Sequence, residues 1–486
     1  MTTRGCFTAG LLASALLLYA GPGRAVPSFA RQTHLPCNAC HTQFPELNSF
    51  GREFKLNGYV LRNIEGLESK TANGRSNLDL PLIPMLSMMF QSSLTQTQRA
   101  MNACTAPTCS SEADSLGRNQ NGTVQFPQQI SLFWGGEITD HIGALGQLTY
   151  SQNSGAIGMD NTDIRFADHI EIDEVPIVYG VSLNNNPTVQ DLWNSTPAWR
   201  FPYASSAVAP TPAAAPIISG ALAQQVAGIT AYALWNDLVY VEAGAYRSAP
   251  QGITGPLGGQ NASDIITNVA PYWRLALQKQ VENQYFMLGT FGIRASLLPG
   301  AAAPAGLPQS NMAQSISGPA NTFTDVGIDF NYQLTLDHDS ITVHGAWIHE
   351  YQNYSNLFVS LGGAQHGSNS LDSFQLAATY HLGTRWGFTI EPFMTFGSRD
   401  NCVYNGGTCA PGTSVAVVSP ITGSRNGLPN NDGVTFELDF NPWQNTRLAL
   451  QYVYYYDFNG AHSNYDGFGR NASYNNTLYL LAWFAY

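Results

Sequence analysis

Three residues near the N-terminus, Cys37, Cys40 and His41, form a C-x-x-C-H pattern. This is the attachment motif of c-type haem, in which two thiols add to the haem vinyl groups and the adjacent imidazole ligates the iron. A redox-active dithiol or half of a zinc site uses the same residue types. A zinc site needs a second ligand pair nearby in the sequence, and none follows the motif. The pattern therefore predicts one covalently bound haem c, with His41 as an axial ligand.

The first 25 residues predict that the motif is exported. Arg4, an apolar stretch at 11–20 and the small-x-small sequence at 23–25 are typical of a secretory signal peptide. The alternative, a membrane anchor, is disfavoured because the apolar run is too short. Of the seven cysteines, Cys6 lies within this signal. Export places the haem motif in the compartment where c-type haem is attached.

A short haem segment, residues 26–78, follows the signal. Phe44, Leu47, Phe50 and Phe54 lie at helical spacing, which predicts one short helix whose apolar side chains wall the haem. A chain of this length is too short to bury a haem alone. We therefore expect another part of the protein to cover it.

Composition points to a membrane barrel for residues 79–486. Charged residues make up 11% of the 486 residues and aromatic residues 12%, against about 25% charged in an ordinary soluble domain. No apolar stretch after the N-terminus has the 18 or more residues of a membrane-spanning helix. The net charge of −12 with few basic residues argues against nucleic-acid binding. A barrel strand alternates apolar and polar positions, which explains a chain with few charged residues, many aromatic residues and no long apolar run.

Period-two alternation marks the predicted strands. In residues 325–337, polar side chains from Asp325 to Asp337 occupy one face and apolar ones from Val326 to Leu336 the other. An even strand number is the rule for single-chain bacterial outer-membrane barrels. Sixteen antiparallel strands are expected, at 81–97, 122–138, 141–152, 163–172, 175–185, 225–236, 237–248, 266–279, 284–297, 323–336, 340–352, 371–383, 385–398, 433–442, 445–458 and 475–486. The predicted fold is thus all-β, a 16-stranded outer-membrane β-barrel with the partly helical haem segment as a plug.

Connection lengths predict the orientation of the barrel. Short turns alternate with long loops, and in this class short turns are periplasmic and long loops extracellular. Both termini then lie on the periplasmic side. The last predicted strand alternates and ends on the aromatic Tyr486, as outer-membrane barrels do. The Pro-rich stretch 186–223 is expected to be an extracellular or inward-folded loop.

Four cysteines fall in predicted long loops. Cys104 and Cys109 lie in the first, and Cys402 and Cys409 in the seventh. Close pairs in an oxidising compartment predict one disulfide in each loop. The alternative is four free thiols.

The second axial ligand of the haem is open. Met85 and Met89 share a strand face with Ser87, which is luminal if the polar face points inward. Thioether ligation raises haem potential. The alternatives are that both methionines only fill space, or that His34 or His344 is the ligand.

Acidic residues on predicted luminal faces are a second group with possible chemistry. A carboxylate site suits a hard cation such as Fe(II), although solvated pore lining is the simpler expectation. The acids are Asp325, Asp329, Glu350, Glu391, Glu437 and Asp439, with Arg165, Arg274, Arg294 and Arg447 as candidate partners.

Several stretches around the motif resemble one family. Residues 26–33, 37–41, 44–47 and 50–52 are similar to the N-terminus of the fused monohaem cytochrome–porins of iron-oxidising bacteria. The sequence departs from the family pattern at His34, where glycine is usual. The resemblance implies an electron-transfer oxidoreductase that oxidises extracellular Fe(II). It also implies electron transfer through the single haem to a periplasmic cytochrome or copper protein.

Two other functions fit the same sequence. A sixteen-stranded barrel is wide enough for an aqueous channel or a small plug. The protein is then a porin whose haem segment is a structural plug or gate for small solutes. The other possibility is a haem enzyme acting on a small molecule, which needs an open iron site.

Overall fold

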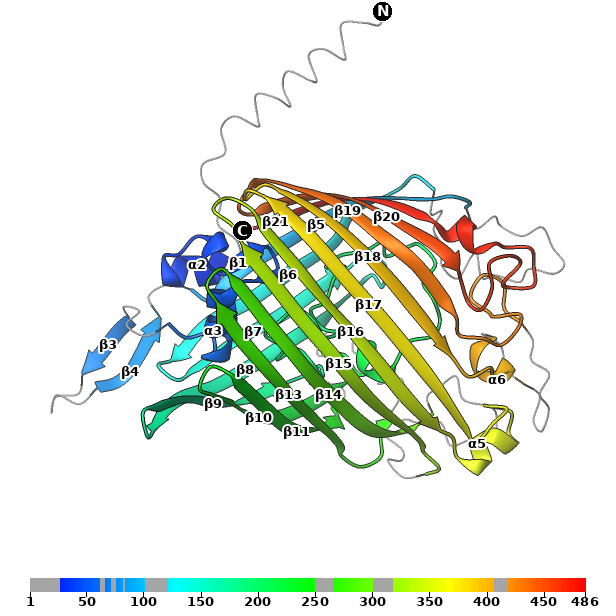
Figure 1. The fold of residues 1–486 in the computed structure, drawn as a ribbon, viewed down its shortest axis with the longest axis horizontal. Coiled ribbons are helices and arrows are strands. Elements are labelled where there is room, and N and C mark those ends of the chain that lie inside the picture. Colours follow the sequence, from blue (N-terminus) through cyan, green and yellow to red (C-terminus); the bar gives the residue numbers. More distant parts are fainter. Residues whose placement is uncertain are drawn as a thin grey trace, which may run out of the picture.

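The computed structural model describes residues 27–61, 66–70, 76–81, 84–100, 121–249, 265–299, 318–405, 409 and 418–486. Most of this chain forms one closed antiparallel barrel (Figure 1). The predicted signal peptide and the predicted Cys104–Cys109 disulfide lie outside the described residues. Within the described residues, no helix has the length and hydropathy needed to span a membrane.

The barrel contains sixteen strands when the two-residue β12 is taken with β13, which it precedes. Each strand pairs with its sequence neighbour, and β21 closes the barrel on β5, with Leu480 opposite Leu94. The strands are β5 (Leu86–Thr97), β6 (Thr123–Thr139), β7 (Ile142–Ser151), β8 (Ala156–Ile172), β9 (Val175–Asn184), β10 (Val226–Trp235), β11 (Val239–Ser248), β12 (Ile265–Ile266), β13 (Ala270–Val281), β14 (Gln284–Leu298), β15 (Asn321–Thr335), β16 (Ser340–Asn353), β17 (Ser368–Leu382), β18 (Trp386–Gly397), β19 (Asn431–Trp443), β20 (Thr446–Asp457) and β21 (Thr477–Ala485). The predicted architecture is confirmed.

Side chains alternate between the lumen and the outer wall. On β13, Trp273, Leu275 and Leu277 are exposed on the outer face, whereas Arg274 and Ala276 between them are buried in the lumen. An apolar outer wall is stable only against lipid, and closure of the sheet leaves no unpaired edge in the hydrocarbon layer. The protein is therefore a multi-pass β-barrel of the outer membrane.

Two predicted strands begin five or more residues from the observed start. The strand expected at 81–97 begins at Leu86, because β4 (Ser76–Pro81) instead pairs with β3 (Gly66–Lys70) in a hairpin outside the barrel. The strand expected at 163–172 begins earlier, at Ala156. Here Gly155 adopts a positive φ of 64°, which permits a tight turn where the sequence indicated a longer loop.

The N-terminal segment, residues 27–61, lies at the barrel end that carries the C-terminus (Figure 1). All strand connections at this end have two to four residues, whereas the opposite end has the long connections and the single tight turn at 152–155, which makes the first end periplasmic. The opposite end carries α5 (Asn356–Ser360) and α6 (Asn401–Tyr404). The N-terminal segment contains α2 (Pro27–Thr33), η1 (Cys37–Ala39), β1 (His41–Gln43), β2 (Glu46–Leu47) and α3 (Ser49–Leu56).

The single helix predicted around Phe44 to Phe54 is only partly correct. Phe44 and Leu47 belong to the β1–β2 hairpin, and the helix α3 begins one residue after Asn48. Asn48 is the N-cap of α3, and its side chain accepts a hydrogen bond from the Gly51 amide at 3.0 Å. The cap separates two elements whose apolar residues happen to share a helical spacing.

Polar contacts fix the N-terminal segment in the barrel mouth. The Arg31 guanidinium donates to the Leu86 carbonyl at 2.6 Å, and the Cys37 amide donates to Gln444 Oε1 at 3.2 Å. From α3, Arg52 donates to Gln333 Oε1 at 2.7 Å. Leu86 lies on β5 and Gln444 in the nearby β19–β20 turn, whereas Gln333 lies on β15, almost half-way round the barrel, so the N-terminal segment spans the mouth.

Candidate functional site

The haem motif lines a cavity between the N-terminal segment and the barrel interior. Cys37, Cys40 and His41 all border it, and its volume is about 540 Å³. Cofactor and small-molecule sites fall in the range of about 300–1,000 Å³. The predicted motif therefore opens onto a space of the size a cofactor requires.

Close packing in the N-terminal segment shapes the motif. In the η1 turn, the Cys40 amide donates to the Cys37 carbonyl at 3.1 Å. The Asn48 amide donates in turn to the Cys40 carbonyl at 3.0 Å. Gly51 packs directly on this turn, because a Cβ at Gly51 would lie 2.1 Å from the Cys40 carbonyl oxygen. The glycine that follows Phe50 is thus required for α3 to approach the motif.

The imidazole of His41 is in the neutral protonation state that binding a metal ion requires. Burial lowers the pKa of its imidazole to about 4, so the ring is neutral at ordinary pH. Its Nδ1 lies 3.3 Å from the Glu46 carbonyl oxygen, which fixes the orientation of the ring. Phe44 packs edge-on against the imidazole, with 5.3 Å between ring centroids.

The Cys40 thiol does not resemble that of a redox-active dithiol. Burial, with a smaller contribution from Cys37, raises the pKa of this thiol to about 11. Catalytic dithiols instead have lowered pKa values, because the thiolate is the nucleophile. Within the described residues, no group of three or more His, Cys, Asp and Glu side chains is arranged to hold a metal ion.

The cavity has an apolar wall and a polar wall. Of the four residues expected to wall a haem, Phe44, Leu47 and Phe54 line the cavity, whereas Phe50 points away and is 37% exposed. The apolar wall also includes Phe29, Phe133, Leu145 and Trp483. The polar wall includes Gln128, Gln129, Gln147, Asp160 and Asn161 from β6, β7 and β8.

The structure separates the candidates for the second ligand. Met89 is buried on the luminal face of β5 and lines the cavity together with His41. Met85 lies before the first residue of β5 and is not among the lining residues. His34 is exposed at the surface of the N-terminal segment, and His344 is buried on β16 but does not line the cavity. Of the four, only Met89 borders the cavity that contains the motif.

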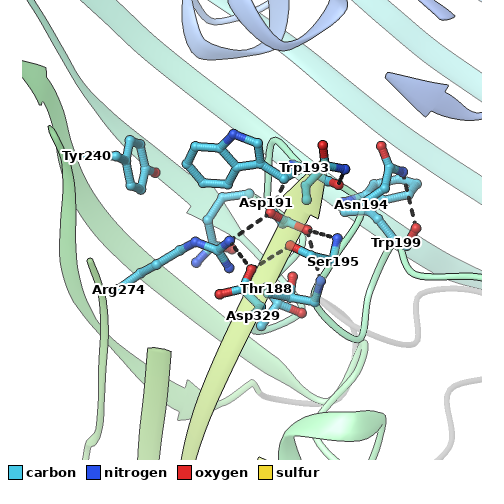
Figure 2. Close-up of polar contacts among 12 residues, drawn as sticks. Thr188, Asp191, Trp193, Asn194, Ser195, Trp199, Tyr240, Arg274 and Asp329 are labelled. Carbon is cyan, nitrogen blue, oxygen red and sulfur yellow. Dashed lines mark hydrogen bonds and ion pairs between the residues drawn. The ribbon is translucent and has the colours of Figure 1, made fainter. Parts of the chain in front are cut away.

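A long inward-folded segment forms another side of the cavity. The lumen loop, residues 185–225, connects β9 to β10 and is buried over much of its length. Near β13 and β15, Asp191 of the lumen loop lies 3.2 Å from Arg274 Nη2 (Figure 2). The same nitrogen lies 2.6 Å from Asp329 Oδ2, which accepts a hydrogen bond from Ser195 of the loop. The inward-folded alternative for this stretch is therefore correct.

The lumen loop then crosses to the opposite wall. Gln375 of β17 donates to the Phe201 carbonyl at 2.8 Å, and Gln451 of β20 donates to the Ala204 carbonyl at 3.1 Å. On β6, Gln128 donates to the Ser205 carbonyl at 3.1 Å. The loop thus contacts strands on both sides of the lumen, which places it across the barrel rather than along one wall.

The luminal acids bind this loop and the arginines. The expectation of solvated pore lining is wrong, because all six predicted acids are at most 6% exposed. Asp325 and Glu350 accept hydrogen bonds from the Ile218 and Ile217 amides of the loop, at 2.8 and 2.7 Å. Arg447 pairs with Glu437 and Asp439, and Arg165 pairs with Asp163.

Arg294 is the one candidate partner of the luminal acids that does not lie in the lumen. It is exposed on the outer face of β14, one position after the buried Ile293, so it cannot reach a luminal acid. Side chains alternate between the two faces along β14, and this alternation places Arg294 on the outer one.

In the seventh long loop, the predicted disulfide between Cys402 and Cys409 is present.

Two cavity residues had no signal in the sequence. Lys55 of α3 and Arg200 of the lumen loop both line the cavity. A lone basic residue in a helix or loop predicts no particular contact, and the inward path of the lumen loop leaves no local pattern.

Comparisons with known proteins give only distant matches. No protein-family model and no curated protein matches the chain. A loop-deletion mutant of OmpT from Vibrio cholerae aligns with 11% identity and a TM-score of 0.43, covering 82% of this chain and 98% of that one. An anion-selective porin from Comamonas acidovorans aligns with 11% identity and a TM-score of 0.40, over 82% and 98% of the two chains. The outer-membrane channel DcaP of Acinetobacter baumannii gives 8% identity and 0.40, over 82% and 96%. The fold assigned above rests on the strand pairing itself.

Proposed function

We propose that the protein carries one haem c in the cavity beside Cys37 and passes electrons through it across the outer membrane. The donor is extracellular Fe(II), and the acceptor is a periplasmic cytochrome or copper protein. In this role the chain is an electron-transfer oxidoreductase. The iron donor and the periplasmic acceptor come from the resemblance of the N-terminal segment to the cytochrome–porins of iron-oxidising bacteria.

One observation carries the proposal: both motif thiols, His41 and Met89 border the same cavity. The donor set suits haem, with two thiols for thioether bonds, a neutral imidazole held by the Glu46 carbonyl, and a thioether that faces the same space. The aromatic wall suits a flat macrocycle. A haem bound here supplies one-electron redox chemistry, and the protein supplies the ligands and excludes bulk water.

The lumen loop supports conduction of electrons rather than solutes. It lies across the lumen and is tied to β13 and β15 on one side and to β6 and β20 on the other. The hydrocarbon layer is about 30 Å thick, so a redox group inside the barrel shortens the path between the two aqueous phases. Electron transfer does not need the continuous aqueous path that a solute needs, so a loop across the lumen obstructs solutes more than electrons.

The test has two stages. Purified protein from a strain able to attach haem should keep a haem-staining band on a denaturing gel, and a C37A/C40A variant should lose it. In liposomes with the long loops outward, added Fe(II) should reduce the haem and then an enclosed cytochrome. A colourless wild-type band overturns the haem assignment. A haem that another donor reduces but Fe(II) does not, at acidic and neutral pH, overturns the iron assignment alone.

A second candidate function is a porin whose haem segment is a plug or gate. The closed sixteen-stranded barrel favours it, because this architecture forms solute channels in other outer-membrane proteins. Conductance in planar bilayers separates the two candidates. The porin predicts steady ion current through the wild-type protein, whereas the electron conduit predicts little current until the lumen loop is released.

A further inference from the structure

We propose that Arg200 of the lumen loop binds a haem propionate, so that the barrel itself holds the charged edge of the cofactor. This inference rests on the proposed function, because it requires haem in the cavity. It adds a binding residue that lies more than 150 positions from the motif in sequence. It also gives the lumen loop a role in the cofactor site besides closing the lumen.

The loop backbone around Arg200 is tightly held. The Arg200 amide donates to the Thr196 carbonyl at 3.1 Å, and Asn194 Nδ2 donates to the Trp199 carbonyl at 3.1 Å. The Trp199 indole donates to the Val189 carbonyl at 2.5 Å. Asn194 also accepts a hydrogen bond from the Leu47 amide, which joins this turn to the N-terminal segment. Arg200 is therefore presented to the cavity from a fixed turn that contacts the haem-motif segment.

The guanidinium of Arg200 has no bonded partner in the part of the chain that the structure describes. Its side chain makes no hydrogen bond, and no described carboxylate lies within ion-pair distance. Glu391 of β18 acts on it electrostatically from farther away, and that carboxylate already accepts a hydrogen bond from Gln375. Burial lowers the pKa of Arg200, and the charge of Glu391 offsets this in part. Arg200 is half-buried and faces the cavity with unused donors, so it can bind an anion that enters there.

The other lining cation, Lys55, is already satisfied. Its ammonium donates to the Val189 and Asp191 carbonyls at 2.8 and 2.6 Å. It also lies 4.7 Å from the centroid of the Trp199 ring. Lys55 thus holds the lumen loop against α3, and this leaves the guanidinium of Arg200 as the lining cation with donors to spare.

The propionates are the only groups of haem that carry a full negative charge at its edge. A guanidinium binds a carboxylate through two parallel hydrogen bonds, which fixes orientation as well as charge. The cavity offers an aromatic wall for the macrocycle.

The experiment compares R200Q and R200K with R385Q in haem-loaded protein. Arg385 lies in an exposed turn at the periplasmic end, so R385Q removes the same charge away from the cavity. Without Arg200 the propionate is uncompensated and favours the oxidised haem. R200Q should therefore lower the equilibrium constant for reduction about tenfold, which is about 59 mV for one electron. R200K should recover most of this shift, and R385Q should not produce it.

The outcomes separate this inference from the proposed function. A haem-stained R200Q with the wild-type potential overturns the role of Arg200 and leaves the electron conduit intact, whereas a wild type without haem overturns both. If R200Q does not fold, R200K decides through the resonance Raman propionate mode. A shifted mode supports the contact, and an unchanged mode in R200K overturns it.

Discussion

Arg274 of β13 and Asp191 of the lumen loop form a buried ion pair, with 3.2 Å between Nη2 and Oδ1. A strand thereby holds the loop inside the barrel. The same nitrogen lies 2.6 Å from Asp329 of β15, so one guanidinium compensates two carboxylates that are otherwise inaccessible to water. Arg274 is therefore the central ionic contact among several that hold the loop, which also include Ser195 to Asp329 and the Ile217 amide to Glu350.

We predict that R274M releases the lumen loop. Removing one partner of a buried ion pair typically costs about 3–5 kcal/mol, because the other charge stays buried and unpaired. Denaturant unfolding should show this loss, and planar-bilayer recordings should show larger and noisier ion currents than the wild type. R294M is the matched control, since Arg294 lies on the outer face of β14. Equal currents and equal stabilities for R274M and R294M would show that Arg274 does not hold the loop.

We predict that Met89 is the second axial ligand of the haem. The variant M89L tests this, with M85L as its control. Of these two methionines, Met89 lines the cavity and Met85 does not, so M89L should lose the thioether contribution and lower the haem potential. Its ferrous form should also bind carbon monoxide more readily. M85L should retain the wild-type spectrum and potential. Wild-type behaviour of M89L would mean that another side chain completes the ligand set.

Substitution of Gly51 tests the packing of α3 on the motif. In G51A the new Cβ must displace the Cys40 carbonyl, and overpacking of this kind costs roughly 1–3 kcal/mol. We expect less covalently attached haem per assembled barrel, measured by haem staining against total folded protein. G158A is the control, because a Cβ at Gly158 meets no atom within 4 Å. Full haem loading in G51A would mean that the turn can move at little cost.

Lys55 predicts how stability depends on pH. Burial, and secondarily the charge of Arg165, lower its pKa to about 7, against about 10.4 in the unfolded chain. The unfolded state therefore binds more protons between these values. Stability should rise there by up to about 1.4 kcal/mol per pH unit.

Unfolding free energies at pH 7 and pH 9 measure this effect. The wild type should gain stability between the two, and K55M should lose that part of the gain because it has no ammonium to titrate. K279M, which removes an exposed lysine at the end of β13, should keep the wild-type slope. The same slope in K55M as in the wild type would assign the pH dependence to other groups.

The barrel could be predicted from local sequence. Its strands follow from a two-residue period that the lipid–lumen boundary imposes on every strand. The spacing of Cys37, Cys40 and His41 predicts haem attachment, which stays a prediction. The Cys402–Cys409 disulfide could be predicted because its partners are close in the chain. The luminal position of Met89 could also be predicted, because it shares a strand face with the polar Ser87.

Only the tertiary structure decided what fills the lumen. The choice between Met85 and Met89 depends on the residue at which β5 begins. Arg274 faces the lumen from β13, whereas Arg294 faces outward from β14. The inward path of the lumen loop and the position of Arg200 in the wall of the motif's cavity depend on contacts between residues far apart in sequence. Such contacts arise from packing in three dimensions and leave no period or spacing in the chain, so no local pattern could reveal them.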